Sequence, residues 1–239
     1  MKQIYLSFLL LFVTVLTGTA QQPAQIRAHQ SAHAANAEHQ PLSADKIWAD
    51  LMEGNKRFVA GRPEPSDLIK LRGSLAKGQQ PKVAILACSD SRVAPELLFD
   101  KSLGDLFVVR SAGNIADAIG VGSIEYAVEH LGSSVLVVMG HTKCGAVTAA
   151  CSGDKMPTPS LQAIVDKIAP AVLQSRKTDG QGGALIESAI KENVHQSTKD
   201  ILASSEVLRH FVEEGKLTIF EAEYNLDTGE VIRLNAETR

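Results

Sequence analysis

Three short runs of continuous apolar residues constrain the fold of this chain more than any other feature of its sequence. They cover residues 83–87, 106–109 and 135–139, and they are separated by segments long enough to form helices. A strand with one face in solvent alternates apolar and polar residues, whereas a strand covered on both faces is apolar throughout. Because these runs do not alternate, they predict strands of a parallel sheet that carries helices on both sides.

The segments around these runs complete an α/β pattern. Helices are predicted in residues 116–131, 145–151, 161–173 and 184–208. Residues 217–224 predict a fourth sheet strand, and residues 231–234 predict a hairpin-like return. Ser43 is placed to cap an earlier helix that ends by Gly61. We therefore expect one α/β domain over residues 42–239, with a mostly parallel central β-sheet flanked by helices and an N-terminal helical arm.

The first 41 residues are expected to lie outside this fold. Lys2 precedes an apolar run over residues 4–16, and Gly18 and Ala20 supply the small residues that a signal peptidase reads. The run is short for a membrane span, so we expect residues 1–20 to be a cleaved signal peptide, with no stable membrane insertion afterwards. The protein would then be periplasmic or secreted. Residues 21–41, rich in Gln, Ala and His, predict a flexible linker, with metal capture by its histidines as the alternative.

Charge and cysteine content exclude two other classes of protein. The chain has 24 Lys and Arg against 27 Asp and Glu, and its net charge of -3 comes without a basic cluster. Nucleic-acid binding needs concentrated positive charge, so that function is not expected. The three cysteines are too few, and odd in number, for a disulfide scaffold. Their role must therefore be sought in their positions.

Two of the predicted strands end on side chains that bind metals. Cys88 follows the first apolar run, and His141 follows the third, with Cys144 three residues later. The carboxyl ends of neighbouring parallel strands meet at one edge of a sheet, which is where such folds bind ligands. Two thiolates and an imidazole suit Zn²⁺, and we expect one ion per chain. The alternative is a pair of buried structural thiols or a disulfide, while Cys151 is expected to pack in the core.

Asp90 and Arg92 add a catalytic element to this site. Three protein ligands leave a fourth position open, as in catalytic zinc sites, where the metal acidifies a bound water. Asp90 lies two residues after Cys88 and can itself take that position as a metal ligand. Alternatively, Arg92 holds Asp90 in a bidentate pair, so that the carboxylate stays off the metal and orients the zinc-bound hydroxide. Both arrangements make Asp90 and Arg92 the candidate catalytic residues.

In these five residues the chain resembles the β-class carbonic anhydrases, and the resemblance extends over about residues 43–239. Near its start that family has the pattern Leu-x-x-Gly-Asn-x-Arg-Phe, which residues 51–58 match. After the second strand it has an Arg-Asn-x-Gly/Ala-Asn segment, which residues 110–114 match except for Ser111 in place of the usual Asn. The resemblance implies a zinc-dependent lyase that reversibly hydrates carbon dioxide to bicarbonate and a proton, with zinc-bound hydroxide as the nucleophile.

The resemblance also implies a substrate pocket. In one subtype of the family a Gln, a Phe and a Tyr line it, and the matching residues here are Gln79, Phe107 and Tyr126. The other subtype carries a Trp three residues before the first Cys, where this chain has Ile85. We therefore expect the Gln/Phe/Tyr subtype, with the amide of Gln79 donating to a substrate oxygen.

Two further residues have expected roles in turnover. Backbone amides near Gly145 are expected to support the developing oxyanion. His130 is a candidate proton relay, with helix capping or core packing as its alternative. Because the family's pockets form between two subunits, a homodimer or homotetramer is implied, with carbon dioxide and bicarbonate as the small-molecule partners.

Two other functions remain open on sequence grounds. The same zinc site could hydrolyse CS2 or COS, which are related heteroallenes. Alternatively, the chain could be a non-catalytic zinc-binding protein that keeps only the fold. The Asp90–Arg92 pair and Gln79 speak against the second alternative, because structural zinc needs neither.

Overall fold

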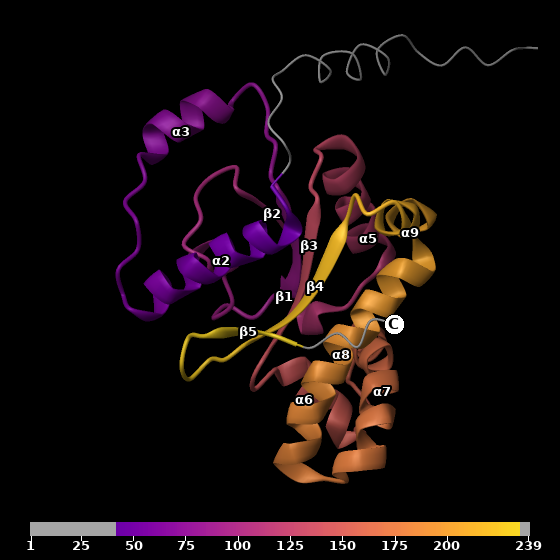
Figure 1. Cartoon of the computed structure of the whole chain (residues 1–239). Helices are drawn as coiled ribbons and strands as arrows, with labels where there is room; N and C mark the ends of the chain where they lie inside the picture. The colour runs from indigo at the N-terminus through magenta and orange to yellow at the C-terminus, as the bar shows by residue number, and fades with distance from the viewer. Residues whose placement is uncertain (1–41, 235–239) are drawn as a thin grey trace, which may run out of the picture. The chain divides into compact units, whose positions relative to one another are not determined.

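The computed structural model describes residues 42–234, and in this part of the chain a single five-stranded sheet forms the centre (Figure 1). The strands are β1 (Val83–Cys88), β2 (Leu106–Ser111), β3 (Val135–His141), β4 (Thr218–Tyr224) and β5 (Val231–Arg233). Their order is β2-β1-β3-β4-β5; the first four are parallel and β5 is antiparallel to β4. The predicted α/β domain with a mostly parallel sheet is confirmed.

Helices lie on both sides of this sheet, and some differ from their predicted bounds. They are α2 (Ala44–Val59), α3 (Leu68–Leu75), α4 (Pro95–Leu98), α5 (Ala118–Glu125), α6 (Gly145–Ser152), α7 (Pro159–Asp179), α8 (Gly182–Ser204) and α9 (Glu206–Glu213), with a 3₁₀ turn at Ala112–Asn114 and a π-helical turn at Tyr126–His130. The single helix expected over residues 184–208 is in fact two. Ser205 breaks it, because its backbone is extended while its hydroxyl caps the amide of Leu208 and donates to Glu125. The short helices α3 and α4 were not foreseen.

The apolar runs are explained by two hydrophobic cores, one on each face of the sheet. Alternate residues of β1, β3 and β4 face α2 and α4 on one side, and the residues between them face α5, α8 and α9 on the other. Strands β1 and β3 are buried at every position, as expected for strands covered twice. Strand β2 is the exception, since it lies at the edge of the sheet and its residues are only partly buried or exposed.

Residues 51–58, which match Leu-x-x-Gly-Asn-x-Arg-Phe, hold α2 against the rest of the domain through close packing and hydrogen bonds. A Cβ at Gly54 would overlap the carbonyl oxygen of Phe99, so only glycine allows this approach. The Nδ2 of Asn55 donates to the carbonyl oxygens of Leu98 and Gly229, each at 3.0 Å, and its Oδ1 accepts from the amide of Val231 at 2.9 Å. The arm helix is therefore part of the packed domain.

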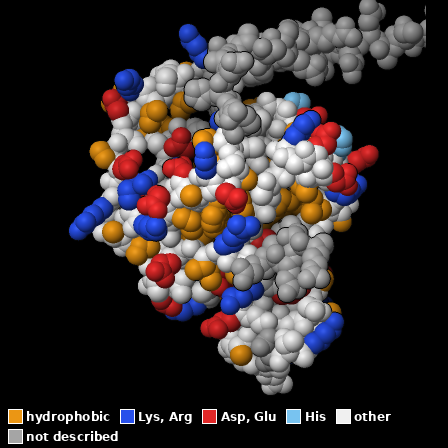
Figure 2. Space-filling model, viewed as in Figure 1, with side chains coloured by type: hydrophobic (Ala, Val, Ile, Leu, Met, Phe, Trp, Pro, Cys, Tyr) orange, Lys and Arg blue, Asp and Glu red, His pale blue; other side chains and the backbone are white. Residues whose placement is uncertain are grey.

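Helix α3 differs from α2. All eight of its residues are exposed or only partly buried, with Leu68 54% and Ile69 76% exposed. In Figure 2, hydrophobic side chains reach the surface in the region of α3. Within residues 42–234, α3 is thus the largely exposed part of the arm, although Leu75 at its end lies against Gly104.

The expected signal peptide and linker, residues 1–20 and 21–41, lie outside the described residues. Within residues 42–234, no helix combines the length and the apolar character that crossing a membrane requires.

Candidate metal centre

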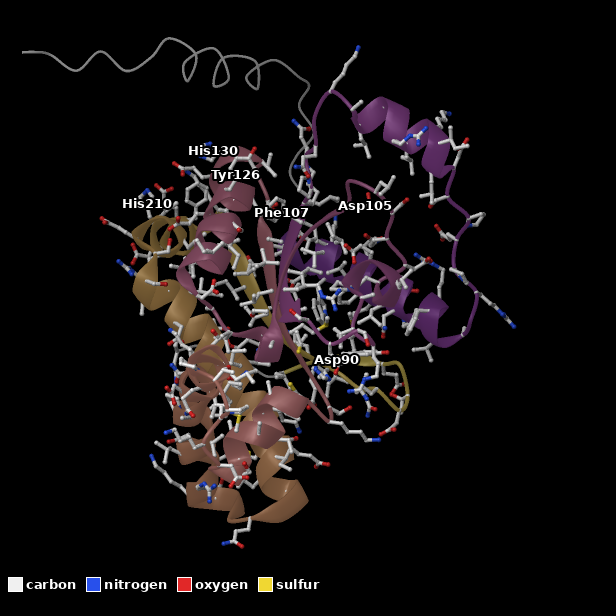
Figure 3. All side chains as sticks on the ribbon, turned by 180° about the vertical axis from the view of Figure 1, so that it is seen from behind. Asp90, Asp105, Phe107, Tyr126, His130 and His210 are labelled. Atoms are coloured by element: carbon white, nitrogen blue, oxygen red, sulfur yellow. The ribbon has the colours of Figure 1, made fainter. Side chains whose placement is uncertain are left out.

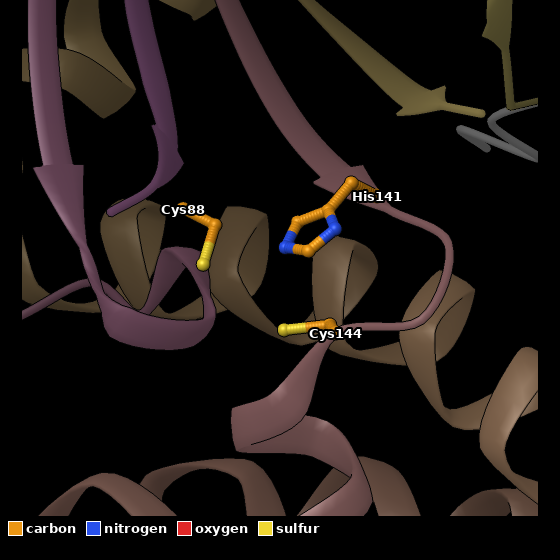
Figure 4. A group of neighbouring side chains, drawn as sticks. All are labelled: Cys88, His141 and Cys144. Atoms are coloured by element: carbon orange, nitrogen blue, oxygen red, sulfur yellow. The ribbon is translucent and has the colours of Figure 1, made fainter. Parts of the chain in front are cut away.

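The ends of β1 and β3 bring two thiols and an imidazole together (Figure 4). Cys88 is the last residue of β1 and His141 the last of β3, while Cys144 directly precedes α6. Their ligand atoms all lie within 4.8 Å of one another, and their exposed fractions are 5%, 0% and 1%. Three soft or borderline donors in such a cluster can hold one transition-metal ion.

The hydrogen bonding of His141 leaves one ring nitrogen free for a metal. Its Nδ1 lies 2.9 Å from the carbonyl oxygen of Thr142, which can only accept, so Nδ1 carries the proton. Its Nε2 therefore presents a lone pair, and this buried atom has no hydrogen-bond partner among the described residues. A buried polar atom without a partner is costly, and a metal ion bound to Nε2 would remove that cost. The residues thus fit zinc.

The two thiols differ in their surroundings. A hydrogen bond from Cys144, together with the neighbouring His141 and the amide of Gly113, lowers the pKa of Cys88 to about 4. The amide nitrogen of Gly113 lies 3.2 Å from the Cys88 sulfur. Conversely, the neighbouring Cys88 and burial raise the pKa of Cys144. One sulfur is therefore ready as a thiolate, and a bound cation would stabilise the second.

Asp90 is held beside this cluster by Arg92. The Nε and Nη2 of Arg92 donate to the two carboxylate oxygens at 2.9 and 2.7 Å, and its backbone amide donates to Oδ1 at 2.9 Å. These contacts keep the pKa of Asp90 well below its usual range. The Oδ2 of Asp90 lies 3.9 Å from Nε2 of His141. The sequence allowed Asp90 either to act as a metal ligand or to pair with Arg92, and the structure shows the pair with Arg92.

Arg110 is a site residue whose role the sequence did not reveal. Its Nε donates to the carbonyl oxygen of Cys88 at 3.1 Å, and its Nη2 donates to the carbonyl oxygen of Asp90 at 2.7 Å. The side chain thereby fixes the backbone that carries one metal ligand and the carboxylate. The sequence signal that could have found it is its position near the end of the second apolar run. Its contacts could not be predicted from that position, because they depend on the pairing of β2 with β1.

Phe107, Tyr126 and His130 lie at the other end of the sheet (Figure 3). Phe107 is paired with Ala84, four residues before Cys88, which corresponds to about 13 Å along the strand. The rings of Phe107 and Tyr126 are 6.3 Å apart, and those of Tyr126 and His130 are 5.3 Å apart. Tyr126 is 48% exposed and the side chain of His130 is 59% exposed. Within one chain these residues form a partly exposed cluster apart from the metal ligands.

Of the other two predicted site residues, Gly145 is next to a metal ligand in the sequence and Gln79 is not. Gly145 is the first residue of α6 and follows Cys144 directly. Gln79 is exposed in the loop before β1, where it lines a hollow of about 420 Å³ with Leu75 and Gly104. One chain thus brings together the predicted ligands, Asp90, Arg92 and Gly145. The pocket roles of Gln79, Phe107 and Tyr126 stay predictions.

Fold and site together define an α/β protein with a Cys–His–Cys cluster beside a carboxylate–guanidinium pair. Residues 83–231 match the family model described as carbonic anhydrase. The sequence is 41% identical over 189 residues to carbonic anhydrase 2 of Mycobacterium tuberculosis, covering 77% of this chain and 90% of that relative. The chain therefore belongs to the carbonic anhydrase family, which is a family of enzymes.

Solved structures agree with this assignment. The β-carbonic anhydrase CcaA superimposes with a TM-score of 0.64 at 29% identity, covering 79% of this chain and 95% of that one. One of two tetrameric β-carbonic anhydrases from the ascomycete Sordaria macrospora has a TM-score of 0.65 at 21% identity, covering 90% and 98%. The fold is thus that of the β-carbonic anhydrases.

Proposed function

We propose that this chain catalyses the reversible hydration of carbon dioxide to bicarbonate and a proton, and that its metal is zinc. The observation that carries the proposal is the buried Cys88–His141–Cys144 cluster, whose free Nε2 lies 3.9 Å from a carboxylate held by Arg92. Two sulfurs and one imidazole match the donors that zinc prefers, and three protein ligands are typical of catalytic zinc sites. The family membership of the chain supports the same reaction.

The chemistry divides between the metal and the side chains around it. Zinc, when bound, lowers the pKa of a coordinated water from 15.7 toward about 7 and so supplies a nucleophile at neutral pH. Asp90 remains ionised because Arg92 donates to both of its oxygens. It can therefore accept a hydrogen bond from the nucleophile and direct a lone pair at the substrate carbon. We expect the amide of Gly145, which follows Cys144 directly where α6 begins, to stabilise negative charge on the substrate oxygens.

A second copy of the chain is part of the proposal. Phe107 and Tyr126 lie on the edge strand β2 and at the end of α5, and Ile119 on α5 is 81% exposed. We call the surface at Phe107 and Tyr126, whose rings are 6.3 Å apart, the β2 flank. An unpartnered edge strand with exposed apolar side chains is suited to burial by another subunit. Packing there would let the β2 flank and Gln79 contribute to the substrate pocket of the partner, and the related Sordaria macrospora enzymes are tetramers.

Stopped-flow hydration of carbon dioxide by the zinc-loaded protein tests this function, with CS2 and COS as competing substrates. We expect one zinc per chain and fast hydration at mildly alkaline pH. Full zinc loading without hydration would refute the proposal. Turnover of CS2 or COS in place of carbon dioxide would reassign the enzyme, and zinc binding with no turnover at all would indicate a non-catalytic protein.

We further propose that the protein is exported and acts in the periplasm or outside the cell. Support comes from the positively charged start, the apolar run and the small residues of positions 1–20. Mass spectrometry of the protein recovered from a periplasmic or secreted fraction should find Gln21 at its N-terminus. Recovery of the uncut chain from the cytoplasm would contradict export.

A further inference from the structure

Two buried polar side chains of helix α8 donate hydrogen bonds to the 3₁₀ turn Ala112–Asn114, which lies beside Cys88. The Nδ2 of Asn193 donates to the carbonyl oxygen of Gly113 at 2.8 Å, and the hydroxyl of Ser197 donates to the carbonyl oxygen of Asn114 at 2.9 Å. Asn193 is 1% exposed and Ser197 is 3% exposed. Polar groups this deeply buried are retained only when they are hydrogen-bonded, so the contacts fix the helix and the turn relative to each other.

Gly113 is the residue through which Asn193 can reach the metal centre. Its amide lies 3.2 Å from the Cys88 sulfur, while its carbonyl oxygen accepts from Asn193. Its φ of 71° lies in the region that favours glycine. A Cβ there would lie 2.7 Å from Cδ1 of Ile168 on α7 and 3.2 Å from the Cβ of Ala146 on α6. Gly113 is therefore enclosed on two sides and anchored by a hydrogen bond from α8.

The amides that act on the other sulfur are close to it in sequence. Cys144 directly precedes α6, and the amides of Ala146 and Val147 in the first turn of that helix act on its thiol. Those donors follow Cys144 by two and three residues. Two amides act on the Cys88 sulfur, that of Asp90 two residues further along the chain and that of Gly113, 25 residues further. The side chain that anchors Gly113 lies another 80 residues on. Among the amides that act on the two sulfurs, the amide of Gly113 is thus the one that comes from a distant segment of the chain.

We propose that Asn193 is a positioning residue of the metal centre, which holds the amide of Gly113 against the Cys88 sulfur. An N–H donor withdraws charge from a thiolate and fixes the direction of its lone pairs, so that the sulfur meets a metal with a defined geometry. Asn193 donates to the backbone of Gly113 and acts on the metal centre through it. This inference rests on the metal-binding part of the proposed function.

A matched pair of variants tests the proposal. Asn193→Ala removes the bond to Gly113, whereas Ser197→Ala removes an equally buried bond from the same helix, one turn away, to Asn114. Each protein is titrated with Co²⁺ against a competing chelator, and its sulfur-to-cobalt charge-transfer band is recorded. We expect Asn193→Ala to bind Co²⁺ about 10–100-fold more weakly with a shifted band, because partners of metal ligands have effects of this size. Ser197→Ala should stay within about threefold of the parent, with an unchanged band.

Equal Co²⁺ affinity and identical spectra in Asn193→Ala and the parent would overturn the positioning role. An equal loss in both variants would also overturn it, since it would show only that the turn needs packing. If the parent itself bound no Co²⁺ or Zn²⁺, the proposed function would fail instead. The two failures are therefore distinguishable without an activity assay.

A measurement on the unmodified chain covers the case in which Asn193→Ala does not fold. The protein is loaded with ¹¹³Cd²⁺, and the amide of Gly113 is examined by NMR for scalar coupling to the metal through the Cys88 sulfur. We expect that coupling to be present. Its absence would overturn the proposal, because Asn193 could not act on Cys88 through an amide that does not bond to the sulfur.

Discussion

The two ends of the central sheet have opposite characters. At the carboxyl end, Cys88, His141 and Cys144 are buried at 5% exposure or less, and the Asp90 carboxylate is held by Arg92. At the amino end, Tyr126 is 48% exposed and the side chain of its neighbour His130 is 59% exposed. One chain therefore organises its metal ligands by itself, whereas of the two expected pocket aromatics it leaves Tyr126 about half exposed and Phe107 partly buried.

This difference indicates which part of the function is intramolecular. A metal site needs fixed ligands, and parallel strand ends supply them from one chain. A substrate pocket needs walls, and here the residues expected to form them are about 13 Å along the strand from Cys88. We infer that metal binding is a property of the monomer and that full activity requires the second copy.

The largest effect on activity should come from replacing a metal ligand at the carboxyl end of the sheet. Cys88→Ser removes a thiolate ligand, so bound zinc should be lost and carbon dioxide hydration should fall by roughly 10³-fold or more. Metal analysis and stopped-flow kinetics measure the two losses. Cys151→Ser is the matched control, since that partly buried free cysteine lies on α6 outside the cluster and should keep both properties. Retained zinc and activity in Cys88→Ser would show that the cluster is not the active centre.

A smaller loss should follow from Asp90→Asn. The amide keeps the size of the carboxylate but loses its charge and half of its acceptor capacity, so hydration should fall by about 10²–10⁴-fold while zinc content stays unchanged. Stopped-flow rates and metal analysis on the same sample test this. Unchanged turnover with full zinc would remove Asp90 from the mechanism.

A substitution on the β2 flank should weaken subunit association and activity without changing zinc content. Tyr126→Ala should weaken subunit association by about five- to tenfold, and kcat/KM should fall by a similar factor, because apolar interface side chains contribute at this level. Analytical ultracentrifugation and stopped-flow assays measure the two changes. Zinc content should not change. Leu173→Ala on α7, where Leu173 is 65% exposed, is the control and should alter neither property. A fully active monomeric Tyr126→Ala protein would refute the inference that full activity requires a second copy.

The smallest effect concerns the contact between the arm and the domain, Arg57 with Asp100. The Nε of Arg57 donates to Asp100 at 2.5 Å, which lowers the pKa of Asp100. A carboxyl whose folded pKa is depressed contributes stability above its ordinary pKa of about 3.9 and loses it as the pH falls through the folded value. Arg57→Gln should therefore be less stable than the parent at pH 7.

The difference in stability between Arg57→Gln and the parent should shrink below about pH 4, as Asp100 becomes protonated in both proteins. Urea unfolding at several pH values measures this, and zinc content should be the same in both. A difference independent of pH would mean that Arg57 acts through packing alone.

Several features of the site were accessible from sequence because their signals are local. The continuous apolar runs indicated strands covered on both faces, and parallel strand ends are neighbours, so Cys88, His141 and Cys144 could be expected together. The spacing of Asp90 and Arg92 allows their ion pair within one short loop. The motif around Gly54 and Asn55 was matched as a pattern, but its contacts to α4 and the β4–β5 hairpin needed coordinates.

The break at Ser205 and the partly exposed edge strand were not foreseen. The break depends on a hydroxyl that meets Glu125, which is 80 residues away in the sequence. The exposure of β2 depends on the order of the strands, which apolar content does not encode. Both depend on where distant segments of the chain meet.

The sequence by itself determined the α/β class, the donor set of the metal centre and the carboxylate–guanidinium pair, because each follows from side-chain chemistry at short spacing. Only the tertiary structure decided that Arg110 fixes the backbone of the Cys88–Asp90 loop, that Asn193 anchors the turn at Gly113, and that Phe107 and Tyr126 lie at the opposite end of the sheet. These relations join segments 20 to 80 residues apart. Strand order and helix packing set such distances, and local periodicity carries no record of them.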